Sequence, residues 1–136
     1  MTTAQTIRIA PLAGLFALAA CVAEPEVSGS ASFAENCASC HGSDGRGGGA
    51  MADALSVAPP DLTTLAARNG GSFPRDAVMS TIDGFARGDH FAPEMPAFGD
   101  GDLGPTVIVE TEEGIGTPVP VELLALADYL ESIQVP

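Results

Sequence analysis

The hydrophobic pattern is clearest near the end of the chain. Hydrophobic residues recur there at helical spacing, at Leu123, Leu126, Leu130 and Ile133. This predicts a helix over residues 121–134 with one buried face. Directly before it, residues 103–120 contain two stretches rich in valine, isoleucine and threonine around an acidic turn with glycine. Such a pattern predicts a small β-hairpin.

Shorter helices are predicted in the middle of the chain. Residues 61–69 begin with Asp61, a residue type that favours helix N-caps, and end in an asparagine followed by two glycines. Residues 74–84 run from a proline, favoured at helix starts, to a glycine, favoured just past helix ends. The predicted fold class is therefore all-α: short helices with a small β-hairpin before the C-terminal helix.

The chain begins with an apolar stretch at residues 9–20 that follows Arg8. It is shorter than the about 20 residues that a membrane-spanning helix needs. It is typical of a secretory signal peptide, predicted over residues 1–20. Its end, Leu18-Ala19-Ala20-Cys21, resembles the lipobox of bacterial lipoproteins, in which the cysteine carries lipid and becomes the new N-terminus. The alternative is ordinary cleavage, for example after Ala23, which removes Cys21.

These features predict the organisation and location of the chain. A lipid-anchored flexible tether is expected at residues 21–32 and one folded domain at residues 33–136. The domain is expected on the periplasmic side of a membrane. Val22 follows the lipobox cysteine, which by resemblance to other lipoproteins indicates the outer membrane, while the inner membrane stays open.

Large side chains are scarce in this sequence. It has one tyrosine and no tryptophan, against 16 glycines and 11 prolines. A small domain of this composition usually needs a further source of stability, such as a disulfide, a metal or another cofactor. A bound cofactor would supply the missing apolar mass.

The charge is strongly acidic. The formal net charge is −13, and all five basic residues are arginines. This argues against nucleic acid and anionic membrane surfaces as partners. It favours a partner with a basic docking face. An acidic surface kept for solubility is the alternative.

Two of the three cysteines stand three residues apart, as Cys37 and Cys40, followed directly by His41. A structural zinc site needs four ligands, and only His90 is a further candidate. A redox dithiol belongs at a strand-to-helix junction of a βαβ pattern, which the sequence lacks. C-x-x-C-H is instead the attachment signature of c-type haem. Since residues i and i+3 share a helix face, both thiols are predicted to bind one haem c covalently, with His41 on its iron.

With this motif the chain resembles the class I c-type cytochromes, over residues 29–133. In that family a glycine and an aromatic residue precede the first haem cysteine by eight and four positions, where the first helix crosses the last; Gly29 and Phe33 have these spacings. The family's last helix carries a leucine–aromatic–leucine pattern, matched by Leu126, Tyr129 and Leu130. The hairpin at residues 103–120 departs from the family.

The resemblance implies a second axial iron ligand from a Met-Pro loop. "PEMPAFGDG" matches that loop and makes Met95 the predicted thioether ligand, which favours a raised potential. His90, five residues earlier, is the alternative ligand and would lower the potential. Met79 is predicted to pack in the core. Met51 lies only ten residues beyond His41.

For two other family features, the proline carbonyl and the partners of the haem propionates, the sequence offers more than one candidate residue. The carbonyl that accepts a hydrogen bond from the proximal imidazole is expected from Pro59 or Pro60. Arg68, Arg75 and Arg87 are candidates either for pairing with haem propionates or for solvated surface charge. The hairpin is interpreted as a cover over one haem edge, with a docking element as the alternative.

The expected function is one-electron transfer by a monohaem c-type cytochrome in the bacterial periplasm, with redox proteins as partners. The resemblance implies an iron with both axial positions filled, so the protein is not expected to be an enzyme. One alternative is an electron-transfer subunit of a larger dehydrogenase or oxidase. The other is a haem ligand-binding sensor or enzyme.

Overall fold

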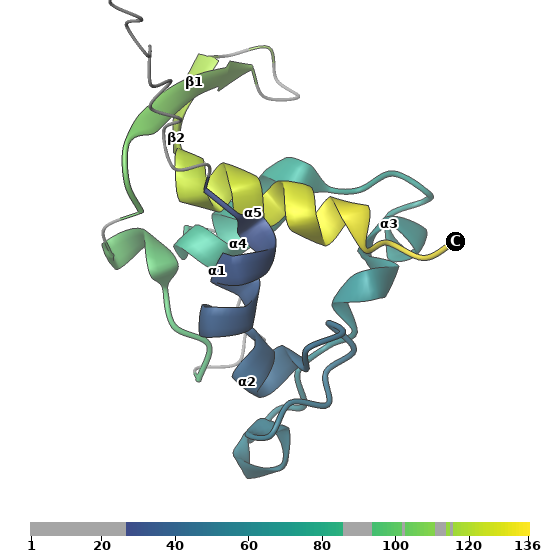
Figure 1. The fold of residues 1–136 in the computed structure, drawn as a ribbon. Helices are drawn as coiled ribbons and strands as arrows, with labels where there is room; N and C mark the ends of the chain where they lie inside the picture. Colours follow the sequence, from purple (N-terminus) through teal and green to yellow (C-terminus); the bar gives the residue numbers. More distant parts are fainter. Residues whose placement is uncertain (1–26, 86–93, 102, 111–113, 115) are drawn as a thin grey trace, which may run out of the picture.

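The computed structural model describes residues 27–85, 94–101, 103–110, 114 and 116–136. The elements in these ranges follow in the order α1 (Gly29–Asn36), α2 (Ala38–His41), η1 (Ala52–Ala54), η2 (Leu62–Thr64), α3 (Leu65–Arg68), α4 (Arg75–Asp83), η3 (Phe98–Asp100), β1 (Thr106–Glu110), β2 (Gly116–Pro120) and α5 (Val121–Ser132). Short helices dominate, with one two-stranded sheet (Figure 1). The predicted fold class is confirmed. Within these ranges, no helix has both the length and the apolar character needed to cross a membrane.

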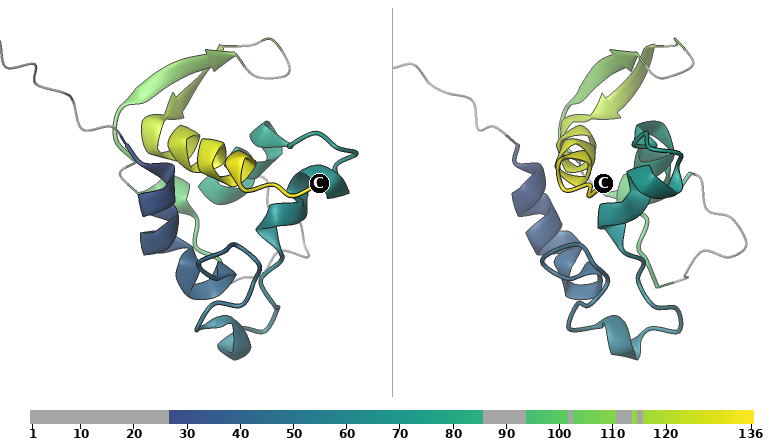
Figure 2. Two further views of the ribbon diagram at one scale, coloured as in Figure 1. Left: turned by 45° about the vertical axis from the view of Figure 1, so that its right-hand side comes forward. Right: turned by 90° about the vertical axis from the view of Figure 1, so that its right-hand side faces the viewer.

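The first and last helices cross closely. Gly29, the first residue of α1, is buried against the backbone of α5, where it faces Ala125. One turn later, Phe33 is fully buried and its ring lies 5.2 Å from that of Tyr129. The helix crossing expected from the family resemblance is therefore present (Figure 2).

The helix α1 begins before residue 33, where the folded domain was predicted to start. It begins at Gly29, and the Ser28 hydroxyl caps it by accepting a hydrogen bond from the Ala31 amide. The predicted boundary at residue 33 lies inside α1, since residues 29–32 form the first turn of this packed helix. The predicted signal peptide and Cys21, the predicted site of lipid attachment, lie outside the described residues.

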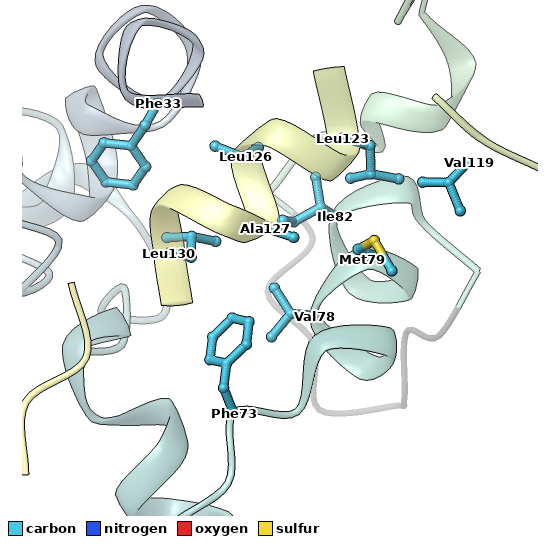
Figure 3. Close-up of a cluster of buried hydrophobic side chains, with 10 residues drawn as sticks. All are labelled: Phe33, Phe73, Val78, Met79, Ile82, Val119, Leu123, Leu126, Ala127 and Leu130. Atoms are coloured by element: carbon cyan, nitrogen blue, oxygen red, sulfur yellow. The ribbon is translucent and has the colours of Figure 1, made fainter. Parts of the chain in front are cut away.

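The rest of the core lies between α4 and α5. Figure 3 shows Val78, Met79 and Ile82 of α4 on the side of the cluster that faces Leu126 and Ala127. Met79 is only 6% exposed. The sequence prediction that it packs in the core is confirmed.

The ends of α4 follow the rules that predicted them. Pro74 precedes its first residue, and Gly84 ends it with a φ of 109°. An L-amino acid with a side chain rarely adopts this conformation, so glycine stops the helix at low cost. Upstream, the Asp61 carboxylate caps η2 by accepting from the Thr63 amide at 2.8 Å.

The hairpin is an antiparallel pair that leads directly into α5. Val107 pairs with Val119, and Ile108 with Pro118. Val119 is buried beside Leu123 at the start of α5 (Figure 3). In both Figure 1 and Figure 2 the hairpin lies at the opposite end of the molecule from α2 and the segment with η1.

The residues after α5 hold η2 and α3 in place. The Gln134 side chain accepts from the Ala66 amide at 2.9 Å and donates to the carbonyls of Leu62, at 2.8 Å, and Leu130, at 2.7 Å. The Val135 amide donates to the Thr63 carbonyl at 2.8 Å. The residues after α5 therefore connect this helix to η2 and α3.

We expect Gln134→Ala to destabilise the haem-loaded protein by about 2 kcal/mol, because three part-buried hydrogen bonds are lost and their backbone partners stay desolvated. Denaturant unfolding, followed by circular dichroism, measures the change. Ser132→Ala is the control, since the Ser132 hydroxyl makes one exposed bond, to the Tyr129 carbonyl. A loss for Gln134→Ala no larger than for Ser132→Ala would show that the Gln134 hydrogen bonds do not hold η2 and α3 in place.

Candidate haem site

An apolar cavity of about 490 Å³ lies between the helices. Its wall takes residues from α1, α2, α4 and α5, from segment 55–62 and from the loop before η3. The wall contains Cys37, Cys40, His41 and Met95. Four residues singled out by the sequence are therefore brought to one space.

The motif C-x-x-C-H forms a tight helical corner. Cys37 ends α1, where its amide donates to the Phe33 carbonyl at 2.9 Å, and its own carbonyl accepts from the amides of Cys40 and His41 at 3.1 and 2.9 Å. One residue thus ends α1 and begins α2. This corner places both thiols and the imidazole on the cavity wall.

The thiol of Cys37 lacks the lowered pKa of a reactive redox cysteine. Both thiols are free. Burial, followed by the nearby Cys40, raises the pKa of Cys37 to about 11. Cysteines that exchange disulfides have lowered pKa values, because the thiolate is the attacking species. Cys37 is instead held as a neutral thiol.

The structure also fails to assemble a zinc site in the part of the chain that it describes. No group of three or more histidine, cysteine, aspartate or glutamate side chains is arranged there to hold a metal ion. His90, the further candidate ligand for zinc or for iron, lies outside the described residues.

The imidazole of His41 fits a haem ligand. Burial lowers its pKa and so favours the neutral ring, the form that ligates metals. Its Nδ1 atom is buried and has no hydrogen-bond partner among the described residues. The Pro60 carbonyl is near enough to raise the pKa again, though not in hydrogen-bonding geometry. The Pro60 carbonyl is therefore the candidate acceptor for Nδ1, the contact that would orient a haem-ligating imidazole.

The structure distinguishes Pro59 from Pro60 as the source of the carbonyl that orients the imidazole. Pro60 acts on the imidazole. The carbonyl of Pro59 faces the glycine-rich turn, where a Cβ on Gly47 would lie 2.3 Å from its oxygen. Pro60 is therefore the better candidate for orienting His41.

The glycine-rich turn closes over the end of α2. The Gly47 amide donates to the His41 carbonyl at 2.7 Å, and the Gly49 amide donates to the Cys40 carbonyl at 3.1 Å. Gly47 has a φ of 89° and passes against Pro59. The turn thereby satisfies carbonyls at the helix end and joins α2 to the segment that carries Pro60.

Met95 has the position that a sulfur ligand needs. It is partly buried and lines the cavity. Met51 is 52% exposed, and Met79 packs in the core; neither lines the cavity. Of the three methionines within the described ranges, only Met95 does so.

The arginines within the described ranges have other partners. Arg75 pairs with Asp128 and Glu131 of α5, which corrects its candidacy for a haem propionate. Arg68 donates to the carbonyl of Asp61 at 2.7 Å. Neither lines the cavity. Arg87 lies outside the described residues.

The interpretation of the hairpin as a cover over a haem edge is wrong for its described residues. None of them contributes to the cavity wall. The hydrophobic side chains of the hairpin pack on the start of α5, or, like Ile108 at 72% exposure, face solvent.

One pair at the site was not predicted. Both the amide and the hydroxyl of Ser56 donate to one carboxylate oxygen of Glu94, the residue before Met95. The two residues are 38 positions apart. No local sequence signal connects them.

The comparison with protein families agrees with this geometry. The family model for cytochrome c matches residues 27–113, more than half of the chain. Searches of curated proteins and of solved structures found no match to the chain. An apolar cavity with two thiols, a neutral imidazole and a thioether on its wall fits the haem of that family. The chain belongs to the cytochrome c family, as a class I c-type cytochrome, and so to proteins that bind covalently attached haem c and transfer electrons.

Proposed function

We propose that this protein is a monohaem electron carrier of the bacterial periplasm, held at a membrane by lipid on Cys21. The observation that carries the proposal is that Cys37, Cys40, His41 and Met95 line a single apolar cavity. When bound, haem c supplies a one-electron couple at its iron. The protein's part is to hold the group, tune its potential and present it to partners.

The four cavity residues have distinct roles in this proposal. Cys37 and Cys40 bind the haem covalently through their sulfurs. His41 ligates the iron as a neutral imidazole, oriented by the Pro60 carbonyl. Met95 ligates it as a thioether, a ligand that favours the reduced metal and raises the potential.

The cavity wall supports this role through its apolar character. Phe33, Leu126 and Leu130 line it from α1 and α5. Apolar side chains around the iron disfavour the additional positive charge of its oxidised form, so they also raise the potential. The acidic net charge of −13 favours redox partners with a basic docking face.

A second candidate function is a stable electron-transfer subunit of a larger dehydrogenase or oxidase. The hairpin favours it, because Val107 and Ile108 are 40% and 72% exposed at the end of the molecule away from α2. A partner subunit bound there would leave the cavity wall free.

The visible spectrum of the haem-loaded protein tests the proposed ligands. In the oxidised wild type we expect a low-spin spectrum with the weak far-red band of sulfur ligation. Met95→Ala should abolish this band and open the iron to carbon monoxide after reduction. Met51→Ala is the matched control and should keep the band, since Met51 is exposed and does not line the cavity.

The absence of the sulfur band from the wild type would favour a different ligand or a different function. If the wild type lacks the band and Met95→Ala changes neither spectrum nor carbon monoxide binding, Met95 is not a ligand. Ready carbon monoxide binding by the wild type would then favour a sensor or enzyme. A wild type closed to carbon monoxide would favour His90 as the ligand.

A further inference from the structure

The loop that carries Met95 is joined to another part of the cavity wall by a single carboxylate. One oxygen of Glu94 accepts from the Ser56 amide, at 3.2 Å, and from the Ser56 hydroxyl. Glu94 and Met95 are consecutive, and both line the cavity. The contact therefore acts one residue away from the proposed sulfur ligand.

The other end of this contact belongs to the segment that reaches His41. Ser56 lies between Leu55 and Val57, which both line the cavity, and four residues before Pro60. The Pro60 carbonyl acts on the imidazole. One short segment thus contacts the proximal histidine at one end and the methionine loop at the other.

The chemistry of the contact suits a positioning role. Glu94 is an exposed carboxylate and is charged at neutral pH, so both hydrogen bonds that it accepts from Ser56 are charge-assisted. The pair is exposed to solvent, where such contacts contribute little to global stability. Its effect is expected to be local.

We propose that the Ser56–Glu94 pair is a latch that fixes the Met95 loop against segment 55–60 and so holds the thioether at the position of the iron. Both are positioning residues: neither is proposed as a ligand. The inference rests on the proposed function, because it assumes that Met95 ligates. A loosened latch should increase the fraction of protein in which the sulfur has left and the iron accepts an external ligand.

Imidazole titration of the oxidised, haem-loaded full chain measures that fraction, because imidazole competes with the thioether. We expect Glu94→Ala, which loses both hydrogen bonds, to bind imidazole about tenfold more tightly than the wild type. Ser56→Ala keeps the amide bond and should show a smaller increase, about threefold. Ser56→Thr retains the hydroxyl and should restore wild-type binding.

Two further variants separate the latch from a general loss of structure. Ser72→Ala and Glu35→Gln remove an exposed hydroxyl and an exposed carboxylate outside the cavity wall and should leave imidazole affinity unchanged. In a double-mutant cycle, Ser56→Ala should add nothing to Glu94→Ala, because the hydroxyl has lost its acceptor. Full additivity would overturn the proposed pairing.

The same experiment distinguishes failure of the Ser56–Glu94 latch from failure of the proposed Met95 ligation. If the wild type shows the far-red sulfur band and the Ser56 and Glu94 variants bind imidazole as it does, the latch is wrong and the electron-carrier proposal stands. If the wild type lacks the band, Met95 ligation is wrong and the latch fails with it. Unfolding midpoints of all variants show whether tighter imidazole binding merely follows lower stability.

Discussion

Gly29→Ala is expected to lower the free energy of unfolding by about 3 kcal/mol, the upper end of the usual cost of overpacking a tight interior. A Cβ atom at this position would lie 1.9 Å from the Ala125 carbonyl oxygen and 2.5 Å from its carbon. Both are backbone atoms of α5, so no side-chain rotation relieves the clash. The two helices have to separate, and the packing of Phe33 on Tyr129 weakens with them.

Helix propensity alone predicts the opposite sign. Alanine is favoured over glycine inside a helix by about 1 kcal/mol. The close approach outweighs that gain, because α1 and α5 carry much of the core and both contribute to the cavity wall. The measurement is denaturant unfolding of the haem-loaded protein, followed by far-ultraviolet circular dichroism.

The matched control is Gly48→Ala. Gly48 has no positive φ and no atom near the position of an added Cβ, so its replacement should change stability by less than about 0.5 kcal/mol. If Gly29→Ala is as stable as Gly48→Ala, α1 and α5 do not cross as described. Haem content, measured in parallel, shows whether the crossing also controls the cavity.

The features that could be predicted from the sequence are those set by local chemistry. The apolar repeat from Leu123 to Ile133 predicted α5, because a helical face repeats within a few residues. Proline and glycine predicted the ends of α4 through their own backbone limits. Strand-forming residues around an acidic turn predicted the hairpin. The spacing of Cys37, Cys40 and His41 needs only one helical corner.

The features that could not be predicted depend on which distant residues the fold brings together. The spacing of Arg75 in the sequence does not show that Asp128 and Glu131 lie on the adjacent face of α5. Likewise, nothing near Ser56 indicates Glu94. The choice between Pro59 and Pro60 depends on the path of the glycine-rich turn, which is a tertiary property.

The hairpin shows a different limit. Its strands follow from the sequence, but its place in the molecule does not. From the sequence, it is interpreted as a cover over one haem edge. The structure instead packs Val119 on the start of α5, away from the cavity. A segment that departs from a family pattern has no relative from which to take its position.

The second large effect is expected when both attachment thiols are removed. The core is small and borders an apolar cavity of about 490 Å³. A group that fills this cavity stabilises the folded chain, so lasting haem attachment matters for folding as well as for function. We expect Cys37→Ala/Cys40→Ala to carry no covalent haem when it is made with competent maturation machinery. Each single variant should keep one thioether bond and an intermediate haem yield.

Alanine is the suitable replacement because burial already disfavours the charged form of Cys37, and a serine hydroxyl would be desolvated there. Haem staining after denaturing electrophoresis and intact mass measure attachment. Cys21→Ala is the matched control: it removes the third thiol, which is predicted to carry lipid, and should retain full haem. If the double variant still holds haem through denaturation, the proposed attachment sites are wrong. If the wild type carries none, the proposed electron carrier fails with them, because nothing else proposed for the cavity supplies a redox couple.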